Sequence, residues 1–572
     1  MRVGQGGSGE ERKHNSHAPD SWVIHGSIQA TSIYAHLITV IGAQHVHYAS
    51  PSEAAKLAAE IAALFEQPEK LKEIITSIDV HLSKTYREDL SLPYSLQNSS
   101  MATLDECYIE LTLISQQEQE THESAFKHNK VAPDYEQLYH QEAPIQVSEL
   151  WKPEAYTHVV RQTREPQGLS KPPYRLAIRG AAGMGKTTLL RSLAAQWGKR
   201  REEENASSNI IIKHTLDLTH WREQFHLLLH IPLRDLLTYE PIEEVAGTLS
   251  RREKMLATWL SSHYPNLNQQ EFIVLMLCLT RPQEVHRVLP GRVLLLLDGL
   301  DEVSGLLEEP NALSGQNLEA HHVAEKRHHE QRQELLLTLL GYDHWLLTTR
   351  PHTAEHPKLS GATHHLALTG FSVAQMSQYV ERFCTTLGPQ ENGSKNTRDV
   401  MNWLKQPALR VLAQVPLQLE LLCSVALDTL AQQKPLSQSG QGSDLTQLYT
   451  RMLVVLCRRY LAKFPELLLP GEKAYLACLP EKILLLRCRD ALNWLSACAL
   501  EAMQRQQVVW RVSSFRNAPS FSAKEKDLQT LKGLQQLEAA FDHFGLLAPM
   551  GIKKPNPLEQ DYYFQHLTYQ EF

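Results

Sequence analysis

Eight consecutive residues carry the clearest chemical pattern in this chain. Residues 180–187 read GAAGMGKT, which fits the phosphate-loop pattern GxxxxGK[ST] in full. Glycines in such a loop let backbone N–H groups turn toward phosphate oxygens, and the following helix N-terminus adds a positive partial charge. The nucleotide-binding residues predicted from this run are Gly180, Ala181, Ala182, Gly183, Met184, Gly185, Lys186, Thr187 and Thr188.

Two side chains of this loop have distinct expected roles. Lys186 reaches the β- and γ-phosphates, and the Thr187 hydroxyl holds Mg²⁺. The surrounding sequence agrees, because a strand-like run (174–179) precedes the loop and a helix-like run (187–197) follows it. The alternative is a glycine-rich turn between a strand and a helix that binds no ligand.

A second candidate cluster ends the apolar run Leu294–Leu297. Asp298 follows this run directly, and in a parallel sheet the carboxyl end of a central strand lies at the ligand crevice. We therefore expect Asp298 to bind Mg²⁺, and Asp301 or Glu302 to position the attacking water as catalytic residues. The alternative is a cluster of acids on a surface loop.

A third candidate is Arg350, which ends the strand-like run at 344–350. We expect this guanidinium to sense the γ-phosphate, and we count Arg350 among the catalytic residues. The alternative is a surface arginine in a salt bridge.

The elements that must position these residues alternate between strand-like and helix-like runs from 174 to 350, which is typical of an α/β sheet. The strand candidates are 174–179, 209–218, 292–298 and 344–350. After about 365 the pattern becomes helical. The predicted fold class is an α/β P-loop NTPase domain followed by helical and winged-helix-like domains, with a mostly α N-terminal segment.

The predicted organisation divides the 572 residues into six parts. They are 1–50 (disordered or short strands), 51–130 (N-terminal helical, effector-like), 131–172 (linker), 173–360 (nucleotide-binding domain), 361–442 (helical domain) and 443–572 (winged-helix-like region). The chain stops at Gln570-Glu571-Phe572, within the closing motif of that last region, so we expect either a truncated product or sensing by the core and a partner.

Composition narrows the class of protein. Hydrophobic residues make up 42% and the net charge is −7, which favours packed cores and argues against bulk attraction to nucleic acid or membrane. The eight cysteines form no CxxC pair and lie among apolar residues, so we expect reduced thiols and a cytoplasmic location. No signal peptide or apolar run long enough to span a membrane is present in the sequence.

The 28 histidines raise a metal-binding hypothesis. His321, His322, His328 and His329 lie in a polar insertion at 303–334, and His321 and Glu325 have a spacing that zinc ligands use on a helix. Many solvated helices share this spacing, so a polar surface insertion is the favoured interpretation.

The order GAAGMGKTTLL, LLLLDGLDEV and LLTTRP resembles the NACHT group of STAND-type P-loop ATPases, which includes NOD-like receptors. Distal segments agree: 368–383 resembles the start of the first helical domain, 415–423 its Pro-Leu segment, 445–453 the start of the winged-helix region and 564–572 its closing motif. The resemblance covers about 170–572. It departs from the family in a longer spacing before Asp298, with an insertion near 240–290, and in Val415 where glycine is common.

The resemblance implies ATP/ADP and Mg²⁺ as cofactors, with Pro416 near the adenine and His566 on the β-phosphate of ADP. It further implies a closed ADP-bound monomer that oligomerises after exchange for ATP, hydrolyses ATP slowly and gathers its N-terminal effector regions. A signalling role, similar to innate immunity, follows by the same analogy, with the trigger and the downstream protein unidentified. The alternatives are an AAA+-like remodeller with fast turnover and a non-enzymatic scaffold.

Overall fold

The computed structural model describes the greater part of the chain in two compact units, residues 1–75 with 243–290 and residues 76–242 with 291–572. The described residues are 59, 63–88, 108–115, 144–151, 175–180, 183–205, 218–239, 251–289, 291–307, 320–350, 362, 364–387, 393–431, 436, 445–469, 471–505, 507, 509–515, 537, 541, 546–550 and 558–564. The predicted strand at 209–218 lies outside them except for its last residue.

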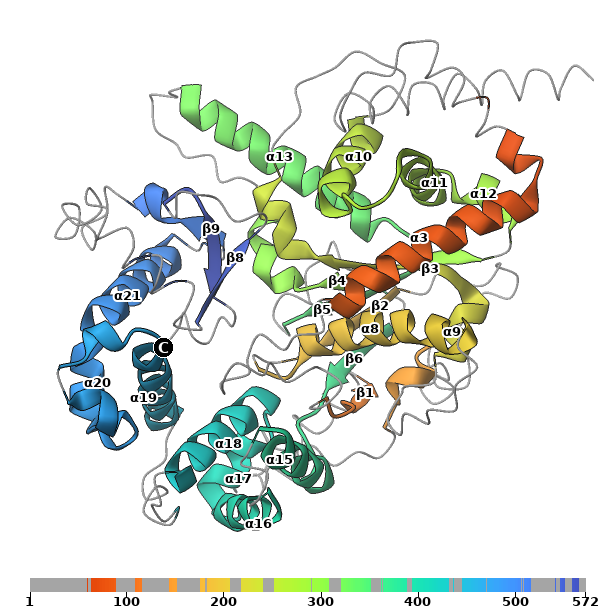
Figure 1. Ribbon diagram of the computed structural model, residues 1–572. Helices are drawn as coiled ribbons and strands as arrows, with labels where there is room; N and C mark the ends of the chain where they lie inside the picture. The colour runs from red at the N-terminus through yellow and green to blue at the C-terminus, as the bar shows by residue number, and fades with distance from the viewer. Residues whose placement is uncertain are drawn as a thin grey trace, which may run out of the picture. The chain divides into compact units, whose positions relative to one another are not determined.

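The second unit is built on a six-stranded sheet in the order β1-β6-β2-β5-β4-β3 (Figure 1). Its strands are β1 (Leu113–Ser115), β2 (Arg175–Arg179), β3 (Phe225–Pro232), β4 (Arg292–Asp298), β5 (Trp345–Thr349) and β6 (His364–Leu368). All neighbours pair in parallel except β1, which runs antiparallel to β6 at the edge. The sheet confirms the predicted α/β class of a P-loop NTPase.

Three predicted strands are present as β2, β4 and β5. Their central residues are buried, as expected for parallel strands covered on both faces. The sequence did not predict β1, β3 or β6. The run FHLLLHIP of β3 is a short apolar stretch that periodicity alone does not distinguish from part of a buried helix. Strands β1 and β6 are too short to show a period.

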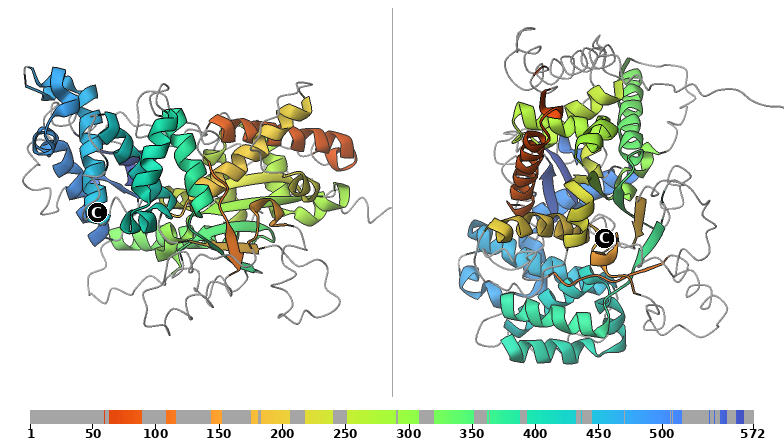
Figure 2. Two further views of the ribbon diagram at one scale, coloured as in Figure 1. Left: turned by 90° about the horizontal axis from the view of Figure 1, so that it is seen from below. Right: turned by 90° about the vertical axis from the view of Figure 1, so that its right-hand side faces the viewer.

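Helix α8 (Lys186–Asn205) follows the phosphate loop and packs beside helix α3 (Pro68–Glu88), as the two views agree (Figures 1 and 2). The Trp197 indole N–H donates to the buried Asp79 carboxylate over 2.6 Å, and Arg222 lies 3.5 Å from the same carboxylate. A Cβ on Gly198 would lie 2.8 Å from the Ser83 carbonyl oxygen, so the two backbones approach closely there. The part of α3 from Thr76 onward therefore belongs to the core of this unit.

The segments upstream of the phosphate loop also join this core. Leu113 pairs with Leu368 of β6 and, in an isolated bridge, with Ile145. A short 3-10 helix, η1 (Val147–Glu149), leads to Trp151, whose ring is fully buried and packs edge-on against Phe225 of β3. Residues 144–151 lie in the predicted linker, and this described stretch is a packed element of the sheet unit.

The second unit continues with a helical cluster that the views show as one group (Figures 1 and 2). It contains α15 (Val373–Leu387), α16 (Gly393–Leu404), α17 (Pro407–Ala413) and α18 (Pro416–Ala431). Ser372 and Gln375 form a reciprocal cap at the start of α15, which satisfies two free backbone N–H groups. The described residues from Val373 to Ala431 are mainly helical, as predicted after about residue 365, although β6 extends to Leu368 and a small sheet follows later in the chain.

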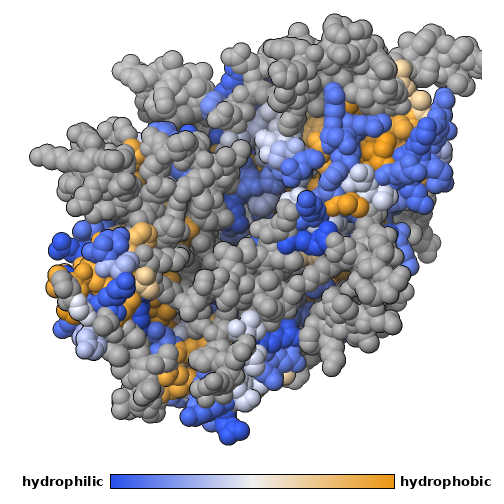
Figure 3. Space-filling model, viewed as in Figure 1, coloured by the Kyte–Doolittle hydropathy of each residue, from blue (hydrophilic) through white to orange (hydrophobic). Residues whose placement is uncertain are grey.

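The C-terminal part of the unit contains helices and a small antiparallel sheet in the order β7-β9-β8. The elements are α19 (Leu445–Lys463), α20 (Glu481–Arg487), α21 (Arg489–Gln504), β7 (Val509–Arg511), β8 (Leu547–Met550) and β9 (Asp561–Phe564), with 3-10 helices η8 (Pro465–Leu467), η9 (Glu472–Cys478) and η10 (Val512–Phe515). Leu486 of α20 and Leu500 and Met503 of α21 are exposed apolar side chains, and orange surface marks this region in Figure 3.

The remaining helices of the sheet unit are α9 (Thr219–Gln224), before β3, and α13 (Ala320–Leu340), before β5. Two 3-10 helices, η3 (Leu233–Thr238) and η4 (Leu300–Leu306), follow β3 and β4.

In the first unit, the insertion near 240–290 forms α10 (Arg251–His263), α11 (Gln269–Thr280) and α12 (Pro282–Val288), with Asn268 and Glu271 capping α11. No helix in the described part of the chain is long and apolar enough to cross a membrane.

We expect Asp79→Ala to destabilise the sheet unit by about 2–4 kcal/mol, because it leaves Arg222 without a buried carboxylate and Trp197 without its acceptor. Urea unfolding followed by tryptophan fluorescence measures this loss. Glu73→Ala on the exposed side of the same helix is the control and should change the midpoint little. Equal stability of the two variants would show that α3 is not anchored through Asp79.

Candidate nucleotide-binding and hydrolysis site

The phosphate loop has the backbone that its glycines predict. Gly183 and Gly185 adopt positive φ of 78° and 84°, and a Cβ on either would lie 3.1 Å from a neighbouring side chain. The Gly180 N–H donates to the Thr349 carbonyl over 3.1 Å, which ties the loop to the end of β5. Lys186 starts α8 and its Nζ donates to the Gly180 carbonyl over 2.8 Å, so its side chain folds back across the loop.

Three of the other predicted loop residues are described by the structure. Met184 is buried, and Thr187 and Thr188 lie in the first turn of α8. Ala181 and Ala182 lie outside the described residues.

Asp298 ends β4 at the carboxyl edge of the sheet, where it is 3% exposed. The Thr348 hydroxyl of β5 donates to its Oδ1 over 2.7 Å and accepts from the Gly299 N–H over 2.9 Å. The sequence did not predict Thr348 as a site residue. Its hydroxyl fixes one oxygen of Asp298, and carboxylate oxygens are ligands that Mg²⁺ prefers.

A left-handed turn at Gly299 (φ 79°) redirects the chain into η4 and brings the next acids to the same edge. Asp301 Oδ2 lies 2.9 Å from Arg350 Nε, and the two side chains are 7% and 20% exposed. The structure therefore brings together two residues that the sequence predicted separately. Both side chains are mostly shielded from solvent, and the salt bridge is one that the alternative interpretation of Arg350 also expects.

Glu302 has a partner that the sequence did not predict. Arg234 Nε of η3 lies 3.5 Å from Glu302 Oε2, and both side chains are mostly buried. The pairing follows from strand register, because Pro232 at the end of β3 lies opposite Asp298 at the end of β4. A charged pair directly after an apolar run, as in Arg234-Asp235, is the signal that could have identified it.

Burial perturbs two acids of this cluster. The pKa of Glu302 is raised to about 7, mainly by burial and also by the nearby Asp298 and Asp301 carboxylates, while Arg234 and Lys186 oppose the rise. Burial also raises the pKa of Asp235 to about 7, with Arg234 opposing and Asp298 adding to the effect. A carboxyl group with a pKa near 7 can both accept and return a proton at neutral pH, as general base catalysis requires.

The phosphate-loop lysine is part of the same electrostatic group. Burial lowers the pKa of Lys186, while Asp301 and Asp298 raise it and Arg350 lowers it. Lys186 therefore lies within electrostatic reach of the acids after β4 and of the arginine after β5. A buried ammonium group whose pKa depends on nearby charges is stabilised in its charged form by a polyanionic ligand.

Two further segments contact the phosphate loop. Leu417 N–H of α18 donates to the Gly183 carbonyl over 3.1 Å, and Val415 also packs against Gly183, which places the predicted Pro416 beside the loop. Leu111, just before β1, lies against Gly185 and was not predicted. His566 lies outside the described residues.

The residues present fit a nucleotide with Mg²⁺. The positive φ of Gly183 and Gly185 gives the loop the backbone that phosphate binding requires, and Asp301 Oδ1 is buried without a hydrogen-bond partner among the described residues. Lys186 and the loop N–H groups would hold phosphates, and Thr187 with Asp298 would hold Mg²⁺, which takes its other ligands from phosphate and water. Among the described side chains, no group of three or more His, Cys, Asp or Glu forms a metal site. The side chains of His321 and His322 lie outside that set.

Fold and site together fit a P-loop nucleoside triphosphatase of the α/β class. Residues 174–386 match the family model of the NACHT domain, and the chain therefore carries a NACHT-type NTPase domain. This confirms the resemblance stated from the motifs.

The chain is also similar to curated relatives named NACHT, LRR and PYD domains-containing protein 3. The human and Macaca mulatta proteins are each 22% identical over 426 residues, covering 70% of this chain and 30% of the relative. The Mus musculus protein is 22% identical and covers 71% of this chain and 31% of the relative. The chain thus spans about 30% of the length of these relatives.

We expect Glu302→Gln to gain stability relative to the unchanged protein as pH rises from about 5 to 7.5. The folded-state pKa of about 7 lies above the ordinary 4.5, so the folded protein holds this proton over that window and loses stability as it is removed. Thermal midpoints of both proteins across this pH range measure the difference. A difference independent of pH would show that Glu302 ionises normally.

Proposed function

We propose that the chain binds ATP and ADP with Mg²⁺ and acts as a signalling switch controlled by slow ATP hydrolysis. The observation that carries the proposal is the electrostatic contact between Lys186 of the phosphate loop and the buried Asp298, Asp301, Glu302 and Arg350 group. These side chains follow β2, β4 and β5 and meet at one edge of the sheet, as phosphoryl transfer requires.

Each group has a definite task in this proposal. Bound Mg²⁺ supplies charge neutralisation at the phosphates. Glu302, with its raised pKa, or Asp301 orients the attacking water and holds its proton. Arg350 pairs with Asp301 over 2.9 Å and would contact the γ-phosphate of a bound triphosphate. Loss of the γ-phosphate on hydrolysis would then remove one of the two anionic partners of Arg350.

The nucleotide state would reach the rest of the chain through the phosphate loop. The hydrogen bond from Leu417 to Gly183 links the loop to α18, so a change in the loop acts directly on the helical cluster. We assign residues 361–442 to a helical domain and 443–572 to a winged-helix-like region, which the α20, α21 and β7-β9-β8 arrangement supports. The proposed outcome is a nucleotide-dependent homo-oligomer that gathers the N-terminal effector-like region, 51–130.

Native mass spectrometry of the purified chain tests this proposal. We expect a monomer that carries ADP, and larger assemblies after exchange for a non-hydrolysable ATP analogue with Mg²⁺. Lys186→Ala should lose nucleotide binding, because the phosphates lose their main point charge in a buried site. Lys186→Arg is the matched variant that keeps the charge. Unchanged nucleotide binding by Lys186→Ala would refute the assignment.

The predicted contact between His566 and the β-phosphate of ADP is tested separately. We expect His566→Ala to release ADP about 5- to 30-fold faster, which corresponds to the ~1–2 kcal/mol of a hydrogen bond to a charged group. Release of a fluorescent ADP analogue measures the rate, and Gln565→Ala at the adjacent position is the matched control. If ADP release and oligomer assembly are both unaffected, His566 does not stabilise the closed, ADP-bound monomer.

Steady-state ATP hydrolysis separates the switch from the remodeller. We expect turnover well below about 1 s⁻¹ for a switch, whereas working phosphoryl-transfer enzymes turn over at about 1–100 s⁻¹. Fast turnover stimulated by a partner would favour the remodeller instead.

A further inference from the structure

Besides Asp298 at the end of β4, the acids of the site lie on two short 3-10 helices. η3 carries Arg234 and Asp235, and η4 carries Asp301 and Glu302. A 3-10 helix has poorer hydrogen-bond geometry than an α-helix and is rarely stable over more than one turn without support. The Arg234–Glu302 pair, 3.5 Å apart, joins the two helices near their N-terminal ends.

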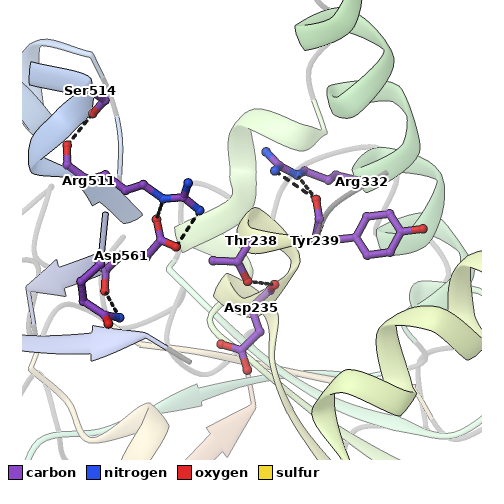
Figure 4. Close-up of polar contacts among 8 residues, drawn as sticks. Asp235, Thr238, Tyr239, Arg332, Arg511, Ser514 and Asp561 are labelled. Carbon is purple, nitrogen blue, oxygen red and sulfur yellow. Dashed lines mark hydrogen bonds and ion pairs between the residues drawn. The ribbon is translucent and has the colours of Figure 1, made fainter. Parts of the chain in front are cut away.

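The opposite ends of both helices are held by two adjacent side chains of α13. Arg332 donates from Nε and Nη2 to the carbonyl of Tyr239, the residue after η3, over 3.1 Å for each bond (Figure 4). Gln333 Nε2 donates to the carbonyl of Leu306, the last residue of η4, over 2.7 Å. Figure 4 shows Arg332 reaching from the helix to the Tyr239 carbonyl, with Asp235 and Thr238 on the adjoining turn.

The C-terminal half of helix α13 is anchored in the core and can hold these contacts in place. Leu335, Leu336 and Leu339 of its C-terminal half are almost completely buried, so this part of the helix is fixed in the core. Just before them, Arg332 and Gln333 direct their donors to two different loops. Helix α13 therefore sets the distance between η3 and η4.

We propose that Arg332 and Gln333 are positioning residues for hydrolysis, which hold η3 and η4 at the spacing that keeps Arg234 against Glu302. They act through the two carbonyl groups that they cap, one after η3 and one at the end of η4. Neither residue was among the site residues predicted from the sequence, since both lie in the polar insertion at 303–334. The kinetic part of this inference rests on the proposed function.

The first test needs no nucleotide. Amide hydrogen exchange in the full chain should show faster exchange at both 233–239 and 300–307 in the double variant Arg332→Gln/Gln333→Ala. We expect an increase of about 5-fold or more, the scale of one lost hydrogen bond. Arg327→Gln, at an exposed position of the same helix, is the control and should leave both segments unchanged.

The second test separates positioning from a loss of folding. We expect Arg332→Gln to lower kcat for ATP by about 10- to 100-fold, the scale of a small misplacement of reacting groups, with ATP affinity changed less than about twofold. Arg332→Lys, which can still donate one bond to the Tyr239 carbonyl, should recover part of the rate. A thermal midpoint close to that of the unchanged protein, in the same samples, confirms that the fold is kept.

Two results would overturn the inference. One is unchanged exchange in η3 and η4 for the double variant, which would mean that α13 does not hold them. The other is a parallel loss of ATP affinity and kcat, or of the thermal midpoint, with no recovery in Arg332→Lys. If the unchanged protein neither binds nor hydrolyses ATP, the proposed function fails while the exchange test still decides the role of α13.

Discussion

The site depends on one constraint, which is the burial of several carboxylates at one edge of a parallel sheet. Asp298 interacts electrostatically with both Glu302 and Asp235, and Asp301 interacts with Glu302. Removing such charges from water is costly unless cations or donors compensate. Compensation comes from different strands: Arg350 after β5, Arg234 after β3, and the Thr348 hydroxyl within β5. The sheet order β2-β5-β4-β3 is what brings these donors to the acids.

The same constraint explains why two carboxyl groups of the site have pKa values near neutral pH. The cations and donors offset only part of the cost of burial, so burial still raises the pKa of Glu302 and Asp235 to about 7. A ligand that adds negative phosphates and a divalent cation changes this balance at every member of the group. The residues that would respond first are Arg350 and Lys186, which interact with the same acids. The phosphate loop, at the same edge of the sheet, also contacts α18, because the Leu417 N–H donates to the Gly183 carbonyl.

The core of the NACHT-type domain is larger than its signature motifs. Trp151, Leu111 and the C-terminal part of α3 lie upstream of the region that matches the family model, and each packs against the sheet or the phosphate loop. The insertion at 303–334 likewise contributes Arg332 and Gln333 to the loops that carry the acids. Segments that look like connectors or insertions in the sequence therefore take part in positioning the site.

Local sequence patterns predict the phosphate loop, Asp298 at the end of β4 and Arg350 after β5, because glycine-rich loops and apolar runs are visible in the order of residues. It could not determine the partners of these residues. That Thr348 holds Asp298, that Arg234 pairs with Glu302 and that α13 caps two loops depend on strand order and register, which join residues far apart along the chain. Long-range pairing of this kind leaves no periodic signal in the chain, so these partners become known from the folded structure alone.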